Sequence, residues 1–308
     1  WSPAGSYTLI LESSSGWPLA DGTYSNCTIQ ANIGTALETN LLTISTFTID
    51  SSFTWPGGIL ADLEVWLDTQ DSATLFQEPC GTGTTPAVNN NDPIGCWQDK
   101  SGNGNHASAS GSARGALSTD SINTSQDTVF FDGVDTYYPD IVNLGTQKTI
   151  FVVFQRTDSN NRWLWNWSAS VSSAFIPNWS SRTYFYTNSW TSVTPPAFNA
   201  NTYYVATGEY TSSTTSLFIN ENATSTISGT ANVNTTGNFN LGRYSSAAYT
   251  FLGDVAELII YDRVLSSAEQ DQVQDYLGCK YVLSGTFECW PTLKEVTQIG
   301  LTSDPNPN

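Results

Sequence analysis

A turn rich in side-chain oxygens is the first candidate for chemistry in this chain. Within segment 96–107, four oxygen-bearing residues alternate around two glycines: Asp99, Ser101, Asn103 and Asn105. This is the arrangement of the first half of an oxygen-rich calcium loop, although a serine, Ser110, stands where the closing glutamate would be. Three aspartates on other loops could complete the site: Asp132, Asp135 and Asp254. The alternative is a hairpin turn without metal, because Asn and Asp side chains bond their own backbone.

Aromatic residues form the second candidate. Segment 162–168 alternates tryptophan with other residues, so its rings would lie on one face of a strand. With two tryptophans that follow, the predicted ligand-binding residues are Trp163, Trp165, Trp167, Trp179 and Trp190. Exposed rings can stack on sugar faces while nearby Asn and Ser side chains bond the hydroxyl groups. The alternative is that these rings fill the core of a β-sandwich.

The sequence offers little material for catalysis. His106 is the only histidine, and no G-x-S-x-G segment supplies a nucleophile for it to activate. A single histidine also argues against a His-rich zinc site. We therefore predict that the protein is not an enzyme, and calcium is the one cofactor we consider.

The charge of the chain limits which partners it can bind and where it can be located. It has 28 acidic and 10 basic residues, a net charge of −18 that repels nucleic acid and anionic membrane surfaces. Charged residues make up only 12% of the chain, and no apolar run approaches the roughly 20 residues of a membrane span. We predict an extracellular or cell-surface β protein that binds no nucleic acid and has no membrane span.

Five cysteines fit an oxidising compartment. Cys80 and Cys96 bracket a loop rich in Gly, Thr, Pro and Asn, and Cys279 and Cys289 bracket a second short segment. We predict these two disulfides, which leaves Cys27 over.

Short apolar-alternating runs between Gly, Asn and Ser clusters indicate antiparallel strands. They occur at 6–12, 149–154, 202–207, 216–220 and 255–261. One helix is predicted over 267–277, since Ser266 and Glu269 make a capping box and Gly278 supplies a stop.

Four motifs in order identify a fold family. They are CWQDKSGNGNHA at 96–107, VFFDGVDTYY at 129–138, LGRY at 241–244 and FLGDVAELIIYDRVLS at 251–266. Together they resemble the laminin-G-like, concanavalin A-like jelly roll over about residues 60–283. The resemblance implies an all-β antiparallel jelly-roll sandwich with one short helix, and relatives of this fold often bind calcium.

Some relatives with this fold are glycosidases that carry their acids in a Glu-x-Asp-x-x-Glu pattern, as retaining hydrolysis requires. That pattern is absent from this sequence. Neither Glu64 with Asp68 nor Glu257 with Asp262 supplies that pattern, which makes a glycoside hydrolase the least favoured function.

The chain ends resemble parts of a bacterial Ig-like adhesin repeat. Segments 19–29 and 40–50 are similar to its later strands, and 293–300 with 302–307 to its opening strand. The resemblance implies an incomplete Ig-like domain at 1–55, the jelly roll at 60–283, and a tail at 284–308 that completes an Ig-like domain. Unpaired strand edges need covering, so the tail pairs within its own chain or inserts into a neighbouring subunit. The third alternative is a segment of a tandem-repeat protein.

These resemblances imply a non-catalytic adhesin or surface-fibre module whose jelly roll binds glycans. The alternative is a structural subunit of a self-assembling filament joined head to tail by strand donation. A glycan module should stay monomeric, whereas a fibre subunit should form oligomers that need residues 284–308.

Overall fold

The chain divides into two compact units, Trp1–Thr54 with Cys289–Asn308 and Trp55–Glu288. A computed structural model describes residues 8–11, 22–32, 41–49, 55–167, 174–179, 182–186, 192–193, 198–211, 214–220, 222–228, 238–243, 249–283, 285 and 287. In the first unit, strands β1 (Thr8–Leu11), β2 (Gly22–Asn32) and β3 (Leu41–Ile49) form an antiparallel sheet in that order. The Ig-like assignment of the chain ends stays a prediction.

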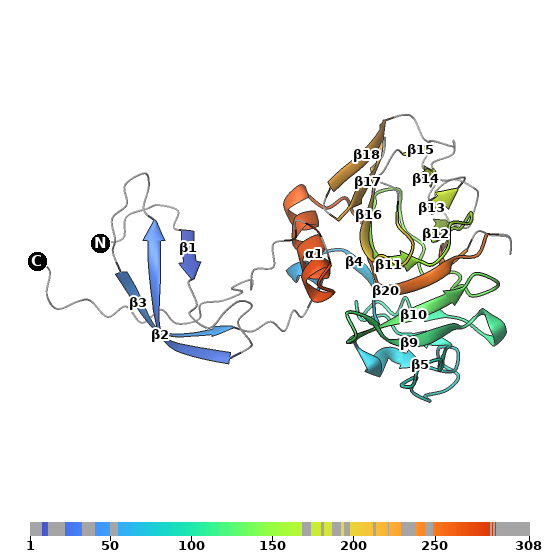
Figure 1. The fold of residues 1–308 in the computed structure, drawn as a ribbon, viewed down its shortest axis with the longest axis horizontal. Helices are drawn as coiled ribbons and strands as arrows, with labels where there is room; N and C mark the ends of the chain where they lie inside the picture. Colours follow the sequence, from blue (N-terminus) through green and yellow to red (C-terminus); the bar gives the residue numbers. More distant parts are fainter. Residues whose placement is uncertain are drawn as a thin grey trace, which may run out of the picture. The chain divides into compact units, whose positions relative to one another are not determined.

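Two antiparallel sheets make the sandwich of the second unit (Figure 1). The larger has the order β18 (Asn222–Ser228), β17 (Thr214–Ile219), β16 (Tyr204–Tyr210), β11 (Lys148–Arg156), β20 (Leu252–Tyr261), β10 (Gln126–Asp132), β9 (Gly115–Ile122) and β6 (Pro93–Ile94), with β4 (Leu63–Asp68) beside β20. The smaller has the order β15 (Ser192–Val193), β14 (Arg182–Tyr186), β13 (Ala174–Trp179), β12 (Trp165–Trp167) and β19 (Phe239–Leu241). The predicted all-β jelly-roll fold is confirmed.

Short elements complete the unit. Strands β5 (Leu75–Phe76), β7 (Cys96–Trp97) and β8 (Ala107–Ser108) form a small sheet. Three single turns of 3-10 helix are η1 (Pro56–Gly58), η2 (Ser72–Thr74) and η3 (Gly111–Ala113), and helix α1 spans Ser267–Lys280. No helix in the described part of the chain is long and apolar enough to cross a membrane.

Strand β11 shows why the larger sheet is apolar on both faces. Ile150, Val152 and Phe154 pack in the core between the two sheets. Phe151 and Val153 point the other way and join the cluster that includes Val273 and Leu277 of α1. The predicted strand at 149–154 is therefore buried on both faces, which explains its continuous apolar sequence.

Helix α1 begins as the sequence predicts and ends later. Ser266 Oγ accepts a hydrogen bond from Glu269 N, and Glu269 Oε2 accepts one from Ser266 N, so the capping box forms. The helix continues past Gly278 to Lys280, and the predicted stop at Gly278 is wrong. A Cβ at Gly278 would collide with the ring of Phe287, so this glycine serves close packing.

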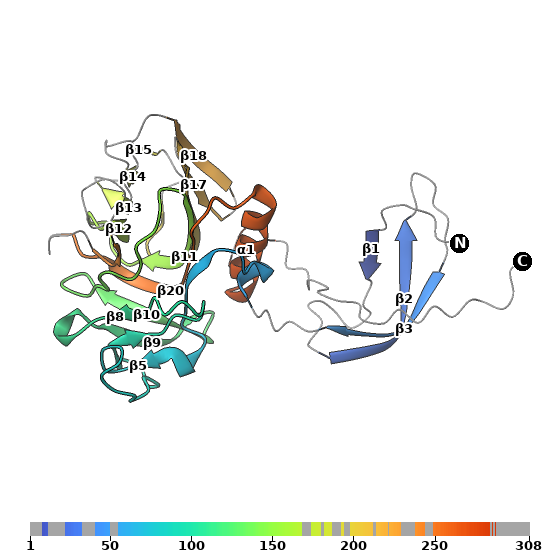
Figure 2. The ribbon, with the colours of Figure 1, turned by 180° about the vertical axis from the view of Figure 1, so that it is seen from behind.

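The first and last described segments of the unit meet at α1. Trp55 and Phe287 both pack against the cluster under this helix. Gly57 of η1 has φ +56°, and a Cβ there would lie 2.7 Å from the Gln272 carbonyl oxygen, so backbone packs directly on backbone. Helix α1 thus covers one side of the larger sheet and holds both ends of the unit (Figure 2).

Candidate functional site

The oxygen-rich turn is held together by the carboxylate of Asp99. Its Oδ1 accepts hydrogen bonds from Trp66 N (2.8 Å) and Ser101 N (2.9 Å). Its Oδ2 accepts from Ser101 Oγ (2.7 Å) and Asn105 N (3.0 Å). Gly102 and Gly104 take φ values of +95° and +78°, as expected for the reversal. Asp99 is therefore the hub of an Asx-type turn.

Amide groups fasten this turn to strand β4. Asn103 Nδ2 donates to the Leu63 carbonyl and Asn105 Nδ2 to the Glu64 carbonyl, both at 2.8 Å. Both oxygens of Asp99 are engaged by protein donors, so a calcium ion bound there would have to displace these hydrogen bonds.

The other predicted calcium ligands lie elsewhere: Asp254 is buried in strand β20, and Asp132 and Asp135 lie in a separate turn. Asp132 Oδ1 accepts from the backbone of Val134, Asp135 and Thr136, and shares no hydrogen-bond partner with Asp99. Among the described residues, no three His, Cys, Asp or Glu side chains are placed to hold one metal ion. Calcium binding stays a prediction, to be checked by melting the protein with calcium and with a chelator.

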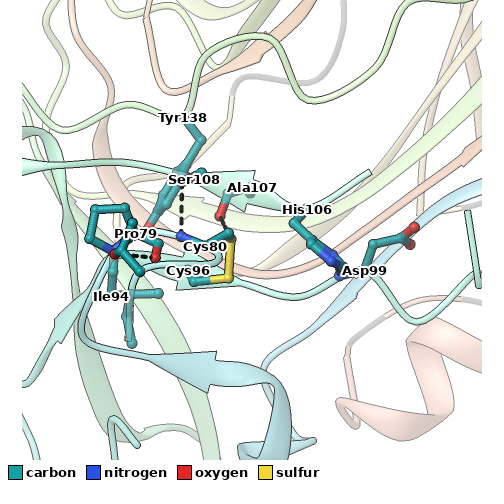
Figure 3. The surroundings of a disulfide bond; sticks show 10 residues. Pro79, Cys80, Ile94, Cys96, Asp99, His106, Ala107, Ser108 and Tyr138 are labelled. Carbon is teal, nitrogen blue, oxygen red and sulfur yellow. Dashed lines mark hydrogen bonds between the residues drawn. A yellow bond between two sulfur atoms is a disulfide. The ribbon is translucent and has the colours of Figure 1, made fainter. Parts of the chain in front are cut away.

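The predicted disulfide between Cys80 and Cys96 is confirmed, with a Cα–Cα distance of 4.7 Å. Figure 3 shows Cys80 N donating to Ser108 Oγ (3.1 Å) beside the bond. It also shows His106 next to Asp99, where the imidazole Nδ1 accepts from Asp99 N (3.0 Å). Cys279 is also disulfide-bonded. Its predicted partner Cys289 and the side chain of Cys27 lie outside the described residues.

The tryptophan row belongs to the core. Trp163, Trp165 and Trp167 are 3%, 0% and 1% exposed, which leaves no ring face for a sugar. The Trp165 ring lies 4.6 Å from that of Phe175, and the Trp167 ring 5.1 Å from that of Phe239. These three are therefore core residues and not ligand-binding ones. Trp190 and the side chain of Trp179 lie outside the described residues.

One buried lysine lies against this row. Lys148 is 0% exposed, and its Nζ is 3.6 Å from the ring centroid of Trp167. Within the described residues the Nζ has no hydrogen-bond partner. Burial lowers the pKa of Lys148 to about 7, against the opposing charge of Asp262.

A second lysine, at the end of helix α1, joins two carboxylates. Asp68 of β4 and Glu257 of β20 are direct cross-strand neighbours. A register shift near Ala256 places Glu257 on the helix side of the sheet, where a regular strand would put it in the core. Lys280 Nζ lies 2.7 Å from Asp68 Oδ1 and 2.7 Å from Glu257 Oε2. The sequence did not reveal this acid pair, because it forms across strands far apart in the chain.

Neutral donors and a second cation complete this network. Trp66 Nε1 (2.7 Å), Tyr276 OH (3.0 Å) and Tyr281 OH (2.9 Å) donate to Glu257. Lys100 Nζ lies 2.9 Å from Asp68 Oδ2. Burial raises the pKa of Glu257, whereas at Asp68 the two lysines outweigh burial and lower the pKa. Glu257 is fully buried, so this acid pair is out of reach of a substrate.

An exposed loop cluster, which we call the rim, lies where β10 and β20 meet. It comprises residues 132–136, 158–162 and 249–250. Gly133 has φ +73°, and a Cβ there would lie 2.8 Å from Leu252 Cβ, so only glycine allows the tight turn after Asp132. Thr250 Oγ1 donates to the Val134 carbonyl (3.0 Å) and ties two of the three segments together.

Arg162 holds the rim from beneath. Its Nη1 donates to the carbonyls of Gly133 (2.7 Å) and Thr250 (2.9 Å), and its Nη2 lies 2.8 Å from Asp158 Oδ2. Burial raises the pKa of Asp158, but the hydrogen bonds and charge of Arg162 outweigh burial and lower it. Each rim segment therefore contacts one guanidinium group, which fixes their mutual positions.

Two apolar side chains project from this fixed rim. Val134 is 67% exposed and Tyr249 is 42% exposed. Tyr249 also has φ +79°, an unfavourable conformation for an aromatic residue, and its carbonyl accepts a hydrogen bond from Trp163 N (3.1 Å). No sequence pattern indicates this surface, because only the fold brings its three segments together.

Comparison with known families places the fold. Residues 137–269 match the model of the concanavalin A-like lectin/glucanases superfamily. These residues are similar to that superfamily, whose jelly-roll fold the second unit has. This jelly roll is the fold that the four motifs imply, and its strand β20 carries the last of them. No curated protein matches the sequence.

Solved structures share the jelly roll at low sequence identity. A GH54 α-L-arabinofuranosidase soaked with a cyclic sulfate inhibitor is 12% identical, with a TM-score of 0.52 over 70% of this chain and 62% of that one. Domain 4 of a GH43 extracellular arabinanase from Geobacillus stearothermophilus, in complex with arabinotriose, is 15% identical, with a TM-score of 0.42 over 70% of this chain and 98% of that one. The Trypanosoma rangeli sialidase is 10% identical, and this chain spans about a third of it (34%), with a TM-score of 0.48 over 72% of this chain. At these identities the likeness concerns the fold alone.

Proposed function

We propose that the jelly roll is a non-catalytic glycan-binding module of an extracellular adhesin or surface fibre. The observation that carries the proposal is the rim, where exposed Tyr249 and Val134 stand on a scaffold fixed by Arg162. An aromatic ring held in place beforehand binds a sugar face with little loss of conformational freedom. The superfamily that these residues match is named after lectins, which bind carbohydrate, and glucanases, which cleave it.

The state of the acid pair supports a binding role over hydrolysis. Retaining glycosidases need two carboxylates about 5 Å apart on either side of the sugar bond. Asp68 and Glu257 are bridged by Lys280 and buried beneath α1, so no sugar can enter between them. We therefore propose that the protein does not cleave the glycans that it binds.

Glycan binding by the whole chain is the direct test. A glycan microarray should give selective signals, and titration calorimetry should show Tyr249→Gly weakening the best ligand about tenfold or more, the loss expected for one stacked ring. Glycine also relieves the unfavourable φ, so the variant should fold. Val282→Ala, at a 71% exposed position beyond α1, is the matched control. New reducing ends on incubation with the ligand would show that the protein is a hydrolase instead.

The division of the chain bears on the filament alternative. Residues Cys289–Asn308 group with Trp1–Thr54, and Trp55 and Phe287 pack on the same cluster. Because the chain enters and leaves the jelly roll at this one cluster, we expect the tail to reach the first unit of its own chain. We propose pairing in cis, which keeps the protein monomeric.

Light scattering over a range of protein concentrations separates the two alternatives. The intact chain should stay monomeric. Concentration-dependent oligomers that vanish when the chain is cut after Glu288 would favour strand donation between subunits. Cys279→Ser with Cys289→Ser in the intact chain is the control, since that cut also removes Cys289.

A further inference from the structure

The charges of the rim bear on which glycans it takes, and this step rests on the proposed glycan-binding function. The three rim segments contain three carboxylates and one cation, Arg162. Both Nη atoms and Nε of Arg162 already donate to Asp158 and to two backbone carbonyls. The one guanidinium is therefore committed within the protein and does not face a ligand.

Among the described residues, neither Asp132 nor Asp135 has an ion-pair partner. Asp132 is exposed, and although burial raises its pKa, backbone hydrogen bonds from Val134 and Thr136 outweigh that effect and lower it. Val134 N (2.9 Å) and Asp135 N (3.2 Å) both donate to Asp132 Oδ1, so the two acidic residues belong to the turn that carries Val134. The rim therefore presents hydrogen-bond acceptors and negative charge beside its apolar surface.

We infer that the rim selects neutral sugars and rejects carboxylated or sulfated ones. Sugar hydroxyls are donors that match the Asp132 and Asp135 carboxylates, while Tyr249 and Val134 offer the apolar contact. A sugar carboxylate or sulfate meets these two like charges, while the guanidinium group of Arg162 is engaged within the rim and that of Arg243 is stacked on an aromatic ring. Asp132 and Asp135 set the specificity, and Arg162 is a positioning residue.

The test compares matched glycan pairs on the full chain. Each neutral oligosaccharide that binds is titrated beside the same compound carrying one sialic or uronic acid. The neutral member should bind at least about tenfold more tightly at low salt, and the ratio should shrink as salt is added. Asp135→Asn should reduce the discrimination between the two members of each pair, because it removes one of the two like charges.

The outcomes separate this inference from the function beneath it. Equal or tighter binding of the acidic member overturns the inference and leaves glycan binding in place. Glycan binding that neither Tyr249→Gly nor Val134→Ser changes moves the site away from the rim. Absence of binding to every glycan overturns both the inference and the proposed function.

Discussion

Two lysines pack against the larger sheet of this jelly roll, one on each side, and their surroundings are opposite. Lys280, the last residue of α1, contacts two carboxylates and the hydroxyl of Tyr276. Lys148, between the sheets, faces the ring of Trp167 and has no hydrogen-bond partner within the described residues. The side chain of Lys280 is 19% exposed and Lys148 is fully buried, so the two amines differ in both their partners and their access to water.

The difference shows that the partners, and not burial alone, set the charge of a buried lysine. At Lys280, burial lowers the pKa, but Glu257 and Asp68 outweigh it and raise the pKa above 10.5. At Lys148, burial prevails and lowers the pKa to about 7. The first lysine is a permanent cation that links strands β4 and β20 to the helix, whereas the second titrates near neutral pH.

Replacing Lys280 should have the largest effect. Lys280→Met leaves Asp68 and Glu257 with only Lys100 for compensation, and breaking a buried ion pair from one side costs roughly 3–5 kcal/mol. For a unit of this size the melting temperature should fall by roughly 6–20 °C. Calorimetry measures the shift.

A double variant is the control for this prediction. Lys280→Met with Glu257→Leu replaces the charged groups by apolar ones and should recover a large part of the loss. If Lys280→Met has the same melting temperature as the unchanged protein, the ion-pair network contributes no stability. The proposed difference between the two lysines would then be wrong.

Replacing Lys148 should act in the opposite direction. Its folded pKa of about 7 lies below the ordinary value of 10.5, so between these pH values the unfolded chain binds more protons. Stability should therefore rise with pH across this window, by up to about 1.4 kcal/mol per pH unit. Lys148→Met should be more stable at pH 7 and should lack this slope.

Urea unfolding at pH 7, 8 and 9 measures the slope for both proteins. Lys280→Met is the matched control, because a raised pKa gives a contribution that is complete below pH 10.5 and is lost only as the pH rises further. Parallel pH profiles for the unchanged protein and Lys148→Met would mean that Lys148 stays charged in the fold.

Signals that act within a few residues made part of this structure predictable from the sequence. Ser266 with Glu269 identified the start of α1, and the glycines of the 96–107 turn identified a reversal, because these signals act within a few residues. The alternation of Trp163, Trp165 and Trp167 indicated a strand but not its burial, because an alternating pattern is the same whether its rings face the core or the solvent.

The sequence does not indicate which polar groups become neighbours, because the fold brings them together from distant parts of the chain. Trp66 and Glu257 are 191 positions apart and become hydrogen-bonded neighbours only when β4 lies beside β20. A register shift near Ala256 then decides which face Glu257 takes. The rim depends in the same way on Arg162, whose partners come from three separate segments.

The smallest loss of stability is expected from a change at the start of α1. This change should affect the surroundings of Lys280 and not those of Lys148. Ser266→Ala removes the side chain that accepts from Glu269 N, and losing such a cap costs about 1 kcal/mol. Fraying there should raise hydrogen exchange across α1, which carries Lys280, while the pH slope assigned to Lys148 should stay unchanged. Ser267→Ala, the next position, is the control because it leaves the cap intact. A cap variant that alters the slope would mean that the sheet transmits changes from one lysine to the other, and the two regions would then form one cooperative unit.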